Sequence, residues 1–204
     1  MAAARILILF HSTAGATWRM AKAVAEGVTA AGAEAAIKQV PEIAEAEAIA
    51  GPGAHERRAA FADVPVAEPG DLLECDGLAV GTPVHFGTMS AALRVFFDRT
   101  GRFWMEGSLI GKPATVFTAA GSGGGRETAI LATWSMLAVH GMTLVPLGMR
   151  DSGISDLSSA HGASPLGAGT VAGGPGDRPS KTECRMARTQ GRALAEIAQA
   201  LRRG

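Results

Sequence analysis

The chain has 204 residues, in which 19 lysine and arginine residues are balanced by 19 aspartate and glutamate residues. This length suits one domain with a substantial hydrophobic core, and the zero net charge argues against nucleic acid or an anionic membrane surface as a partner. No apolar run reaches the roughly 18 residues that a membrane-spanning helix needs, so we expect no integral membrane segment.

Cysteine and histidine are few and scattered. The two cysteines, Cys75 and Cys184, cannot form a disulfide framework, which fits a reducing cytoplasm. The segment MAAARILILF resembles a short signal sequence, but it continues into a Ser/Thr-rich loop without a cleavage-type site, so a first strand is the better interpretation. The five histidines show no metal-ligand spacing, so we expect no metal.

The first strongly patterned stretch is RILILFHSTAGAT, residues 5–17. Its unbroken apolar run predicts a strand covered on both faces, as in a parallel sheet. The first loop, residues 11–17, follows, and an alanine-rich pattern then predicts a helix with one face formed by Trp18, Ala21, Ala25 and Val28. A hydroxyl-rich loop between a strand and a helix N-terminus can bind an anion, although an ordinary capped loop is the alternative. The loop has neither the lysine of a P-loop nor the three glycines of a dinucleotide fingerprint.

The next segment gives weaker signals. Gly32 closes the first helix, and residues 33–40 predict a second strand. Residues 41–70 predict a surface excursion with helical character at 42–50, and residues 71–76 predict a helical turn.

A third strand is predicted at residues 77–80, followed by the second loop, residues 81–87. The helix after this loop is capped by Thr88 or Ser90 and ends at Gly101. Its predicted core face carries Leu93, Phe96 and Phe97.

A fourth buried strand, residues 114–118, runs into the third loop, residues 119–125. Four glycines in five residues of this loop allow the backbone to approach a ligand closely. A helix is predicted from Glu127 to about residue 140, where Gly141 stops it, and a strong strand at residues 142–147.

Residues 148–180 contain no periodic pattern, and a loop of this length is either functional or binds a partner. Residues 182–202 return to a helix with one side formed by Met186, Leu194, Ile197 and Leu201. We therefore expect a single domain over residues 1–204 with an irregular arm, at about residues 148–180, that serves the active site or an oligomer.

The alternation of strands and helices predicts a doubly wound parallel α/β sheet with helices on both faces. The first, second and third loops all follow strands, so they meet at one edge of this sheet. Three such loops rich in Ser, Thr and Gly favour a phosphate-bearing ligand.

Several separated segments resemble one family. Over almost its whole length the chain is similar to the flavodoxin-like NAD(P)H:quinone oxidoreductases, the tryptophan-repressor-binding-protein family of FMN proteins. The resemblance implies a five-stranded sheet of order 2-1-3-4-5 and a homotetramer built partly by the arm. It rests on AKAVAEGV (21–28), IKQVPE (37–42), GTPVHFG (81–87), RTGRFW (99–104), VFTAAGSGGGRET (116–128), HGM (140–142), SPLGAGTVAGGPGDRPS (164–180) and ARTQG (187–191).

The resemblance also implies which residues bind FMN. In the first loop they are Ser12, Thr13, Ala14, Gly15, Ala16 and Thr17, and in the second Thr82, Pro83, Val84, His85, Phe86 and Gly87. In and before the third loop they are Thr118, Ala119, Ala120, Gly121, Ser122, Gly123 and Gly124, and His140 joins them. The candidates for a catalytic role are His85, Trp104 and His140.

The chain departs from the family pattern at several of these positions. The family usually has an aromatic residue at position 14 and His or Asn at position 16, where this chain has alanine, and Arg is common at position 85. The family's flavin-site histidine aligns with Val139 rather than His140, for which a helix-end cap is the better interpretation. A core or interface aromatic is the alternative role for Trp104, and a surface-loop histidine for His85.

The resemblance implies that hydride passes from NAD(P)H to FMN and that a quinone then takes two electrons in the same open pocket. One alternative is a flavodoxin-type electron carrier or flavin-binding regulatory protein without its own NAD(P)H turnover. Zero net charge argues against such a carrier, which is normally acidic. An FMN-dependent azo- or chromate reductase is a further alternative.

Overall fold

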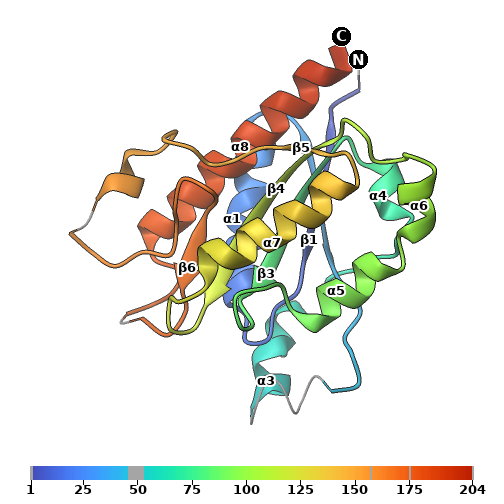
Figure 1. Ribbon diagram of the computed structural model, residues 1–204. Coiled ribbons are helices and arrows are strands. Elements are labelled where there is room, and N and C mark those ends of the chain that lie inside the picture. The colour runs from blue at the N-terminus through green and yellow to red at the C-terminus, as the bar shows by residue number, and fades with distance from the viewer. Residues whose placement is uncertain (1, 46–52, 157, 175, 204) are drawn as a thin grey trace.

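The computed structural model describes residues 2–45, 53–156, 158–174 and 176–203, and a parallel sheet forms its centre (Figure 1). The strand order is β2-β1-β3-β4-β5, as predicted. The strands are β1 (Arg5–Phe10), β2 (Glu34–Gln39), β3 (Gly77–Pro83), β4 (Pro113–Ala120) and β5 (Thr143–Leu144).

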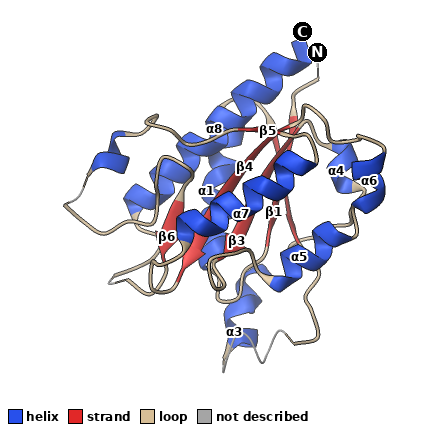
Figure 2. Ribbon diagram, viewed as in Figure 1, coloured by secondary structure: helices blue, strands red, loops and turns tan. Residues whose placement is uncertain are grey.

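Helices cover both faces of this sheet (Figure 2). Residues 6–10 of β1 alternate between two cores, because successive side chains of a strand point to opposite faces. One core lies against α1 (Ala16–Ala30) and α8 (Lys181–Arg203), and the other against α5 (Ala91–Asp98) and α7 (Arg126–Val139). Burial on both sides explains why this strand is apolar throughout.

α1 and α8 pack with direct contact between their backbones. A Cβ atom added to Gly27 would lie 2.0 Å from the carbonyl oxygen of Arg188. One added to Gly191 would lie 2.1 Å from the carbonyl oxygen of Val24. Glycine at these two positions therefore allows the helices to approach.

The arm contains regular structure that the sequence did not predict. It includes a 3₁₀ turn, η2 (Ser152–Ser155), and a short strand, β6 (Gly169–Val171), which pairs in parallel with the carboxyl end of β4. A strand of three residues is too short to show a period of two.

β5 is shorter than the strand predicted at residues 142–147. The Val145 N–H still donates to the carbonyl oxygen of Ala114 at 2.8 Å. Pro146 has no N–H to continue the ladder, and beyond it β6 takes the position beside β4.

Two boundaries in the middle of the chain differ from prediction. β3 continues to Pro83, and Gly81 packs there against Phe117, since a Cβ on Gly81 would lie 2.3 Å from the Phe117 ring. α5 ends at Asp98, and Gly101 begins a further short helix, α6 (Gly101–Met105), instead of ending the preceding one.

The excursion also differs from its prediction. Residues 42–45 are not helical, and residues 46–50 of the predicted helical segment lie outside the described residues. The excursion instead contains α3 (Ala54–Arg58) and η1 (Ala59–Phe61), and α4 (Asp71–Glu74) forms the predicted turn.

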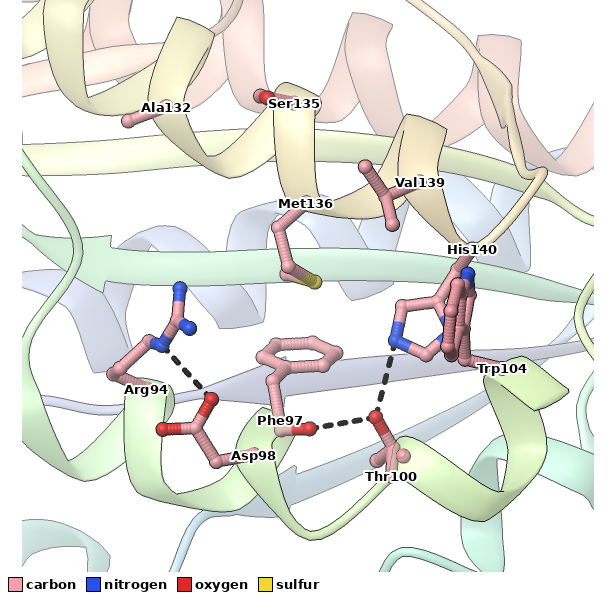
Figure 3. A pocket seen from close by; sticks show the side chains of 11 residues that line it. Arg94, Phe97, Asp98, Thr100, Trp104, Ala132, Ser135, Met136, Val139 and His140 are labelled. Atoms are coloured by element: carbon pink, nitrogen blue, oxygen red, sulfur yellow. Dashed lines mark hydrogen bonds and ion pairs between the residues drawn. The ribbon is translucent and has the colours of Figure 1, made fainter.

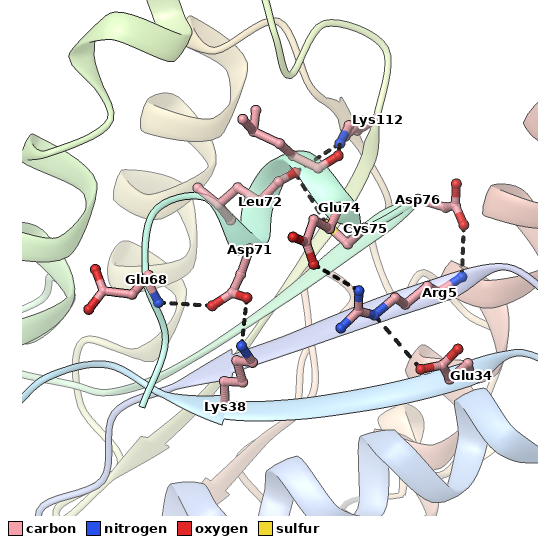
Figure 4. A network of polar contacts seen from close by, with 11 residues as sticks. Arg5, Glu34, Lys38, Glu68, Asp71, Leu72, Glu74, Cys75, Asp76 and Lys112 are labelled. Carbon is pink, nitrogen blue, oxygen red and sulfur yellow. Dashed lines mark hydrogen bonds and ion pairs between the residues drawn. The ribbon is translucent and has the colours of Figure 1, made fainter. Parts of the chain in front are cut away.

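Charged contacts tie α4 to the sheet (Figure 4). The backbone N–H of Arg5 in β1 donates to Asp76 at 2.8 Å, and Lys38 of β2 pairs with Asp71 at 2.6 Å. Lys112, just before β4, donates to two carbonyl oxygens of α4. The network fixes the chain immediately before β3 enters the sheet.

Candidate functional site

The three loops predicted to share one edge of the sheet do so in the structure. Hydrogen bonds connect each loop to the strand next to it. The His11 N–H donates to the carbonyl oxygen of Gly81 at 3.0 Å, and the Val84 N–H donates to that of Ala119 at 2.9 Å. The carboxyl ends of β1, β3 and β4 therefore form one continuous platform.

The first loop wraps around the N-terminus of α1. Gly15 caps this helix with a φ of 88°, a left-handed conformation that favours glycine. Ser12 Oγ accepts hydrogen bonds from the N–H groups of Gly15 at 3.0 Å and Trp18 at 3.4 Å. The first N–H groups of a helix lack intrahelical acceptors, and Thr17 is buried beside them. The loop can therefore hold an anion, although it contains no Lys or Arg.

The second loop presents an aromatic ring to solvent. His85 and Thr88 exchange two backbone hydrogen bonds of 3.0 Å, so Phe86 and Gly87 form a two-residue hairpin turn with φ values of 50° and 79°. The Phe86 side chain is fully exposed. Burial, and secondarily the neighbouring His11, lowers the pKa of the half-buried His85. A strained, exposed aromatic residue is typical of a functional loop.

The third loop lies beside the arm. The Ala172 N–H donates to the carbonyl oxygen of Ala120 at 2.8 Å, and the Gly173 N–H to that of Gly121 at 3.0 Å. The residues after β6 therefore form a wall of the same edge. The sequence indicated this part of the chain through the unpatterned arm at residues 148–180 and through segment 164–180 of the family resemblance.

The predicted binding residues divide by burial. The buried ones support the edge from below: Ser12, Thr17, Thr82, Pro83, Thr118, Ala119 and Ala120. The exposed ones lie at the surface of the loops: Ala14, Phe86, Gly121, Ser122 and Gly124. The partly buried ones lie between them: Thr13, Gly15, Ala16, Val84, His85, Gly87 and Gly123.

Trp104 and His140 lie at the opposite edge of the sheet. His140 follows α7, and the Gly111 N–H donates to the carbonyl oxygen of Gly141 at 2.9 Å, just before the amino end of β4. β4 has eight residues, so roughly 23 Å separates this region from the third loop. Within one chain, the structure does not bring Trp104 and His140 to the three loops.

These two residues line a groove of about 470 Å³ between α5 and α7 (Figure 3). The Thr100 hydroxyl donates to the carbonyl oxygen of Phe97 at 2.6 Å, so it accepts from His140 Nε2 at 3.1 Å. Burial lowers the pKa of His140. His140 occupies the C-cap position of α7, as one interpretation of the sequence proposed, but its ring contacts Thr100.

The sequence analysis missed a charged cluster beside the first loop. His11 Nε2 lies 3.2 and 3.3 Å from the two carboxylate oxygens of Glu42, and Arg58 Nη2 lies 2.7 Å from the same carboxylate. His11 follows β1, Glu42 follows β2 and Arg58 belongs to α3, so no local motif could identify the cluster.

Two further observations concern the chemistry of the site. In the described part of the chain, no three His, Cys, Asp or Glu side chains are arranged to hold a metal ion. Cys75 is buried, and its Sγ donates to the carbonyl oxygen of Leu72 at 3.5 Å. Burial raises the pKa of this thiol.

Comparison with known proteins places the chain in a family. The family model described as NADPH-dependent FMN reductase matches residues 4–150. A protein of Aromatoleum aromaticum described as an NAD(P)H dehydrogenase (quinone) is 47% identical over 203 residues, which cover 98% of each chain. The solved structure of a flavodoxin, WrbA-like protein from Agrobacterium tumefaciens has a TM-score of 0.67 at 21% identity, covering 97% of this chain and 99% of that one. An oxidoreductase from Corynebacterium diphtheriae has a TM-score of 0.60 at 22% identity, covering 98% and 99%. The chain therefore belongs to the NADPH-dependent FMN reductase family.

Proposed function

We propose that the protein binds FMN at the carboxyl edge of its sheet and catalyses two-electron transfer from NAD(P)H to a quinone. The observation that carries this proposal is the meeting of an anion cradle, an exposed aromatic turn and a glycine-rich loop on one platform. The description of the 47% identical relative as an NAD(P)H dehydrogenase (quinone) supports the same activity.

The residues of this edge fit FMN. The helix N-terminus, with the hydroxyls of Ser12, Thr13 and Thr17, would hold the phosphate. Beneath the third loop, Thr118 Oγ1 is buried and has no hydrogen-bond partner among the described residues, so it is available to a polar group of a ligand. When bound, FMN supplies hydride and two-electron chemistry, and the chain supplies binding, orientation and exclusion of water.

The exposed ring of Phe86 would form one wall of the slot in which nicotinamide and quinone bind in turn. Its backbone is fixed by the two hydrogen bonds between His85 and Thr88. A flat ring held in this way can stack on either substrate without rearrangement of the loop.

We also propose that the protein is a homo-oligomer, with a tetramer as the expected state. Trp104 and His140 lie at the far edge of their own chain, so they can serve only a flavin site that belongs to another copy. Apolar side chains exposed on or beside α5, α6 and α7 favour an interface there: Val95, Trp104, Met105, Ile110, Leu131 and Val139. Sedimentation that gives only a 20.8 kDa species at tens of micromolar would contradict this proposal.

The proposed location is the cytoplasm. Both cysteines are free thiols, which suits a reducing compartment. Within the described ranges, no helix has the length and apolar character needed to cross a bilayer.

An anaerobic absorbance experiment tests the central proposal. The purified protein should bind added FMN in a one-to-one ratio, NADH or NADPH should bleach it, and benzoquinone should restore the oxidised spectrum. FMN that dialyses away at micromolar protein would overturn the proposal. Nicotinamide oxidation only with an added reductase would favour an electron carrier.

A further inference from the structure

His11 is held through one ring nitrogen by Glu42. Burial alone would raise the pKa of Glu42, but the hydrogen bond and charge of His11, together with Arg58, lower it below its usual value. The carboxylate is therefore ionised near neutral pH and can only accept hydrogen bonds. It follows that His11 Nε2 carries a hydrogen, so Nδ1 is the ring nitrogen at which a second proton can bind.

The other ring nitrogen, Nδ1, lies unused between two loops of the proposed flavin site. His11 is 6% exposed, and its buried Nδ1 has no hydrogen-bond partner among the residues that the structure describes. His11 lines a small cavity of about 10 Å³ together with Thr13 of the first loop and His85 of the second. A buried polar atom without a partner is rare in proteins and requires an explanation, and a functional role is one of those known.

Resting on the proposed function, we propose that His11 is the residue that holds the proton consumed in quinone reduction, with Glu42 as its positioning residue. NAD(P)H, one proton and a quinone give NAD(P)⁺ and a quinol. The hydride supplies two electrons and one proton, so a second proton must come from solvent. His11 takes this proton at Nδ1 when negative charge builds on the reduced cofactor, and releases it when the quinone is reduced.

The charged groups around His11 suit this role. The Glu42 carboxylate places a negative charge 3.2 Å from His11 Nε2. Arg58 also pairs with the Glu42 carboxylate, at 2.7 Å, and so partly offsets the negative charge beside His11. His85, whose pKa is lowered, adds no charge near neutral pH. On the side of α5, the cavity is lined by Ser90, Ala91 and Ala92, none of which ionises. Additional negative charge at the site therefore shifts the balance toward protonation.

The pH dependence of the flavin midpoint potential tests this inference without measuring turnover. In spectroelectrochemical titrations of FMN-bound protein, the wild type should take up about one more proton per two electrons than His11→Asn. Glu42→Gln keeps the shape but removes the charge, so its additional proton should be taken up only at lower pH. His161→Asn is the matched control, because the Nδ1 of His161 is also buried and without a partner but lies in the arm.

The possible outcomes separate this inference from the proposed function. Protein that binds no FMN would overturn both. Protein that binds and reduces FMN, with equal proton uptake in wild type and His11→Asn, would overturn this inference alone. If His11→Asn fails to fold, ¹⁵N-histidine spectra of the unmodified protein give the answer. Reduction should then protonate Nδ1 of one histidine, and its absence would contradict the role of His11.

Discussion

The guanidinium of Arg178 and the carboxylate of Glu183 meet 3.1 Å apart inside the protein. Glu183 is completely buried at the start of α8. Its two oxygens also accept hydrogen bonds from the backbone N–H groups of Gly162, Val171 and Ser180 and from the Thr170 hydroxyl. One carboxylate thus ties β6 and the second half of the arm to α8.

Glu183→Gln should lower the free energy of unfolding by roughly 3–5 kcal/mol, because it removes the negative charge from a buried ion pair. The amide NH₂ group also cannot accept the hydrogen bonds that one carboxylate oxygen receives. Urea denaturation at neutral pH measures the loss. Glu196→Gln, an exposed position of the same helix, is the control and should change stability by less than about 0.5 kcal/mol. Equal losses in the two variants would contradict this role for Glu183.

The contribution of Glu183 should also depend on pH. Burial alone would raise its pKa, but hydrogen bonds from Ser180, Val171, Thr170 and Gly162 outweigh burial and lower the pKa. A carboxyl with a lowered folded-state pKa stabilises the protein fully above its unfolded-state pKa of about 4.3, and this stability is lost as pH falls through the folded-state pKa. The difference in stability between wild type and Glu183→Gln should therefore shrink below about pH 4. Thermal unfolding of both proteins between neutral and acidic pH measures this difference. A difference that stays constant over this range would contradict the lowered pKa.

Gly27→Ala should destabilise the protein by about 3 kcal/mol, because its methyl group would overlap the backbone of Arg188 in α8. A backbone carbonyl cannot move aside as a flexible side chain can. Chemical denaturation measures the effect, and Gly70→Ala is the control, since a Cβ added there meets nothing within 4 Å. A fully stable Gly27→Ala protein would mean that α1 and α8 do not pack as closely as described.

Phe86→Asn should have opposite effects on stability and activity. The two-residue turn of Phe86 and Gly87 has positive φ at both positions, a geometry that favours Asn-Gly, so the free energy of unfolding should rise by about 1 kcal/mol. Loss of the ring should lower kcat/KM for a quinone roughly two- to tenfold, since an aromatic pair contributes about 0.5–1.5 kcal/mol. Phe86→Tyr keeps both the ring and the strain and should change neither quantity much. A more stable and equally active Phe86→Asn protein would exclude a role for the ring.

The strands β1, β3 and β4 could be predicted because burial on both faces leaves long apolar runs in the sequence. β6 could not, because its three residues are held by backbone pairing with β4 and by the distant Glu183 rather than by a local pattern. The shortening of β5 has the same origin, since tertiary pairing overrides the β propensity of its apolar residues.

Only those parts of the candidate site that are formed by residues close together in the sequence could be predicted. The three loops follow directly from strand ends, so their meeting follows from the sheet order. The pairing of His11 with Glu42 depends on how the excursion folds over the first loop, which no motif records. The position of Trp104 shows the converse, because a residue can belong to a recognisable segment and still lie at the edge of the sheet opposite the three loops.

The first loop also permits a prediction about FMN affinity. It contains no Lys or Arg, and two N–H groups at the start of α1, those of Gly15 and Trp18, already donate to Ser12 Oγ. Each hydrogen bond to a charged group contributes about 1.5–3 kcal/mol, so a missing polar side chain at position 16 corresponds to roughly ten- to a hundredfold in affinity. We expect the protein to purify substantially without FMN.

Ala16→Asn and Ala16→His should therefore tighten FMN binding by about tenfold or more, and Thr17→Val should weaken it. Ala16 is the first residue of α1 and is partly exposed, so a longer polar side chain can reach an anion at the helix N-terminus. Thr17 is buried in the same turn, next to the N-terminal N–H groups in the sequence. Fluorescence titration with FMN measures each affinity. Ala30→Asn is the matched control, because it places the same side chain at the exposed carboxyl end of α1, where the helix dipole disfavours an anion. If the position 16 variants and Thr17→Val all bind FMN as tightly as wild type, the phosphate must bind outside the first loop.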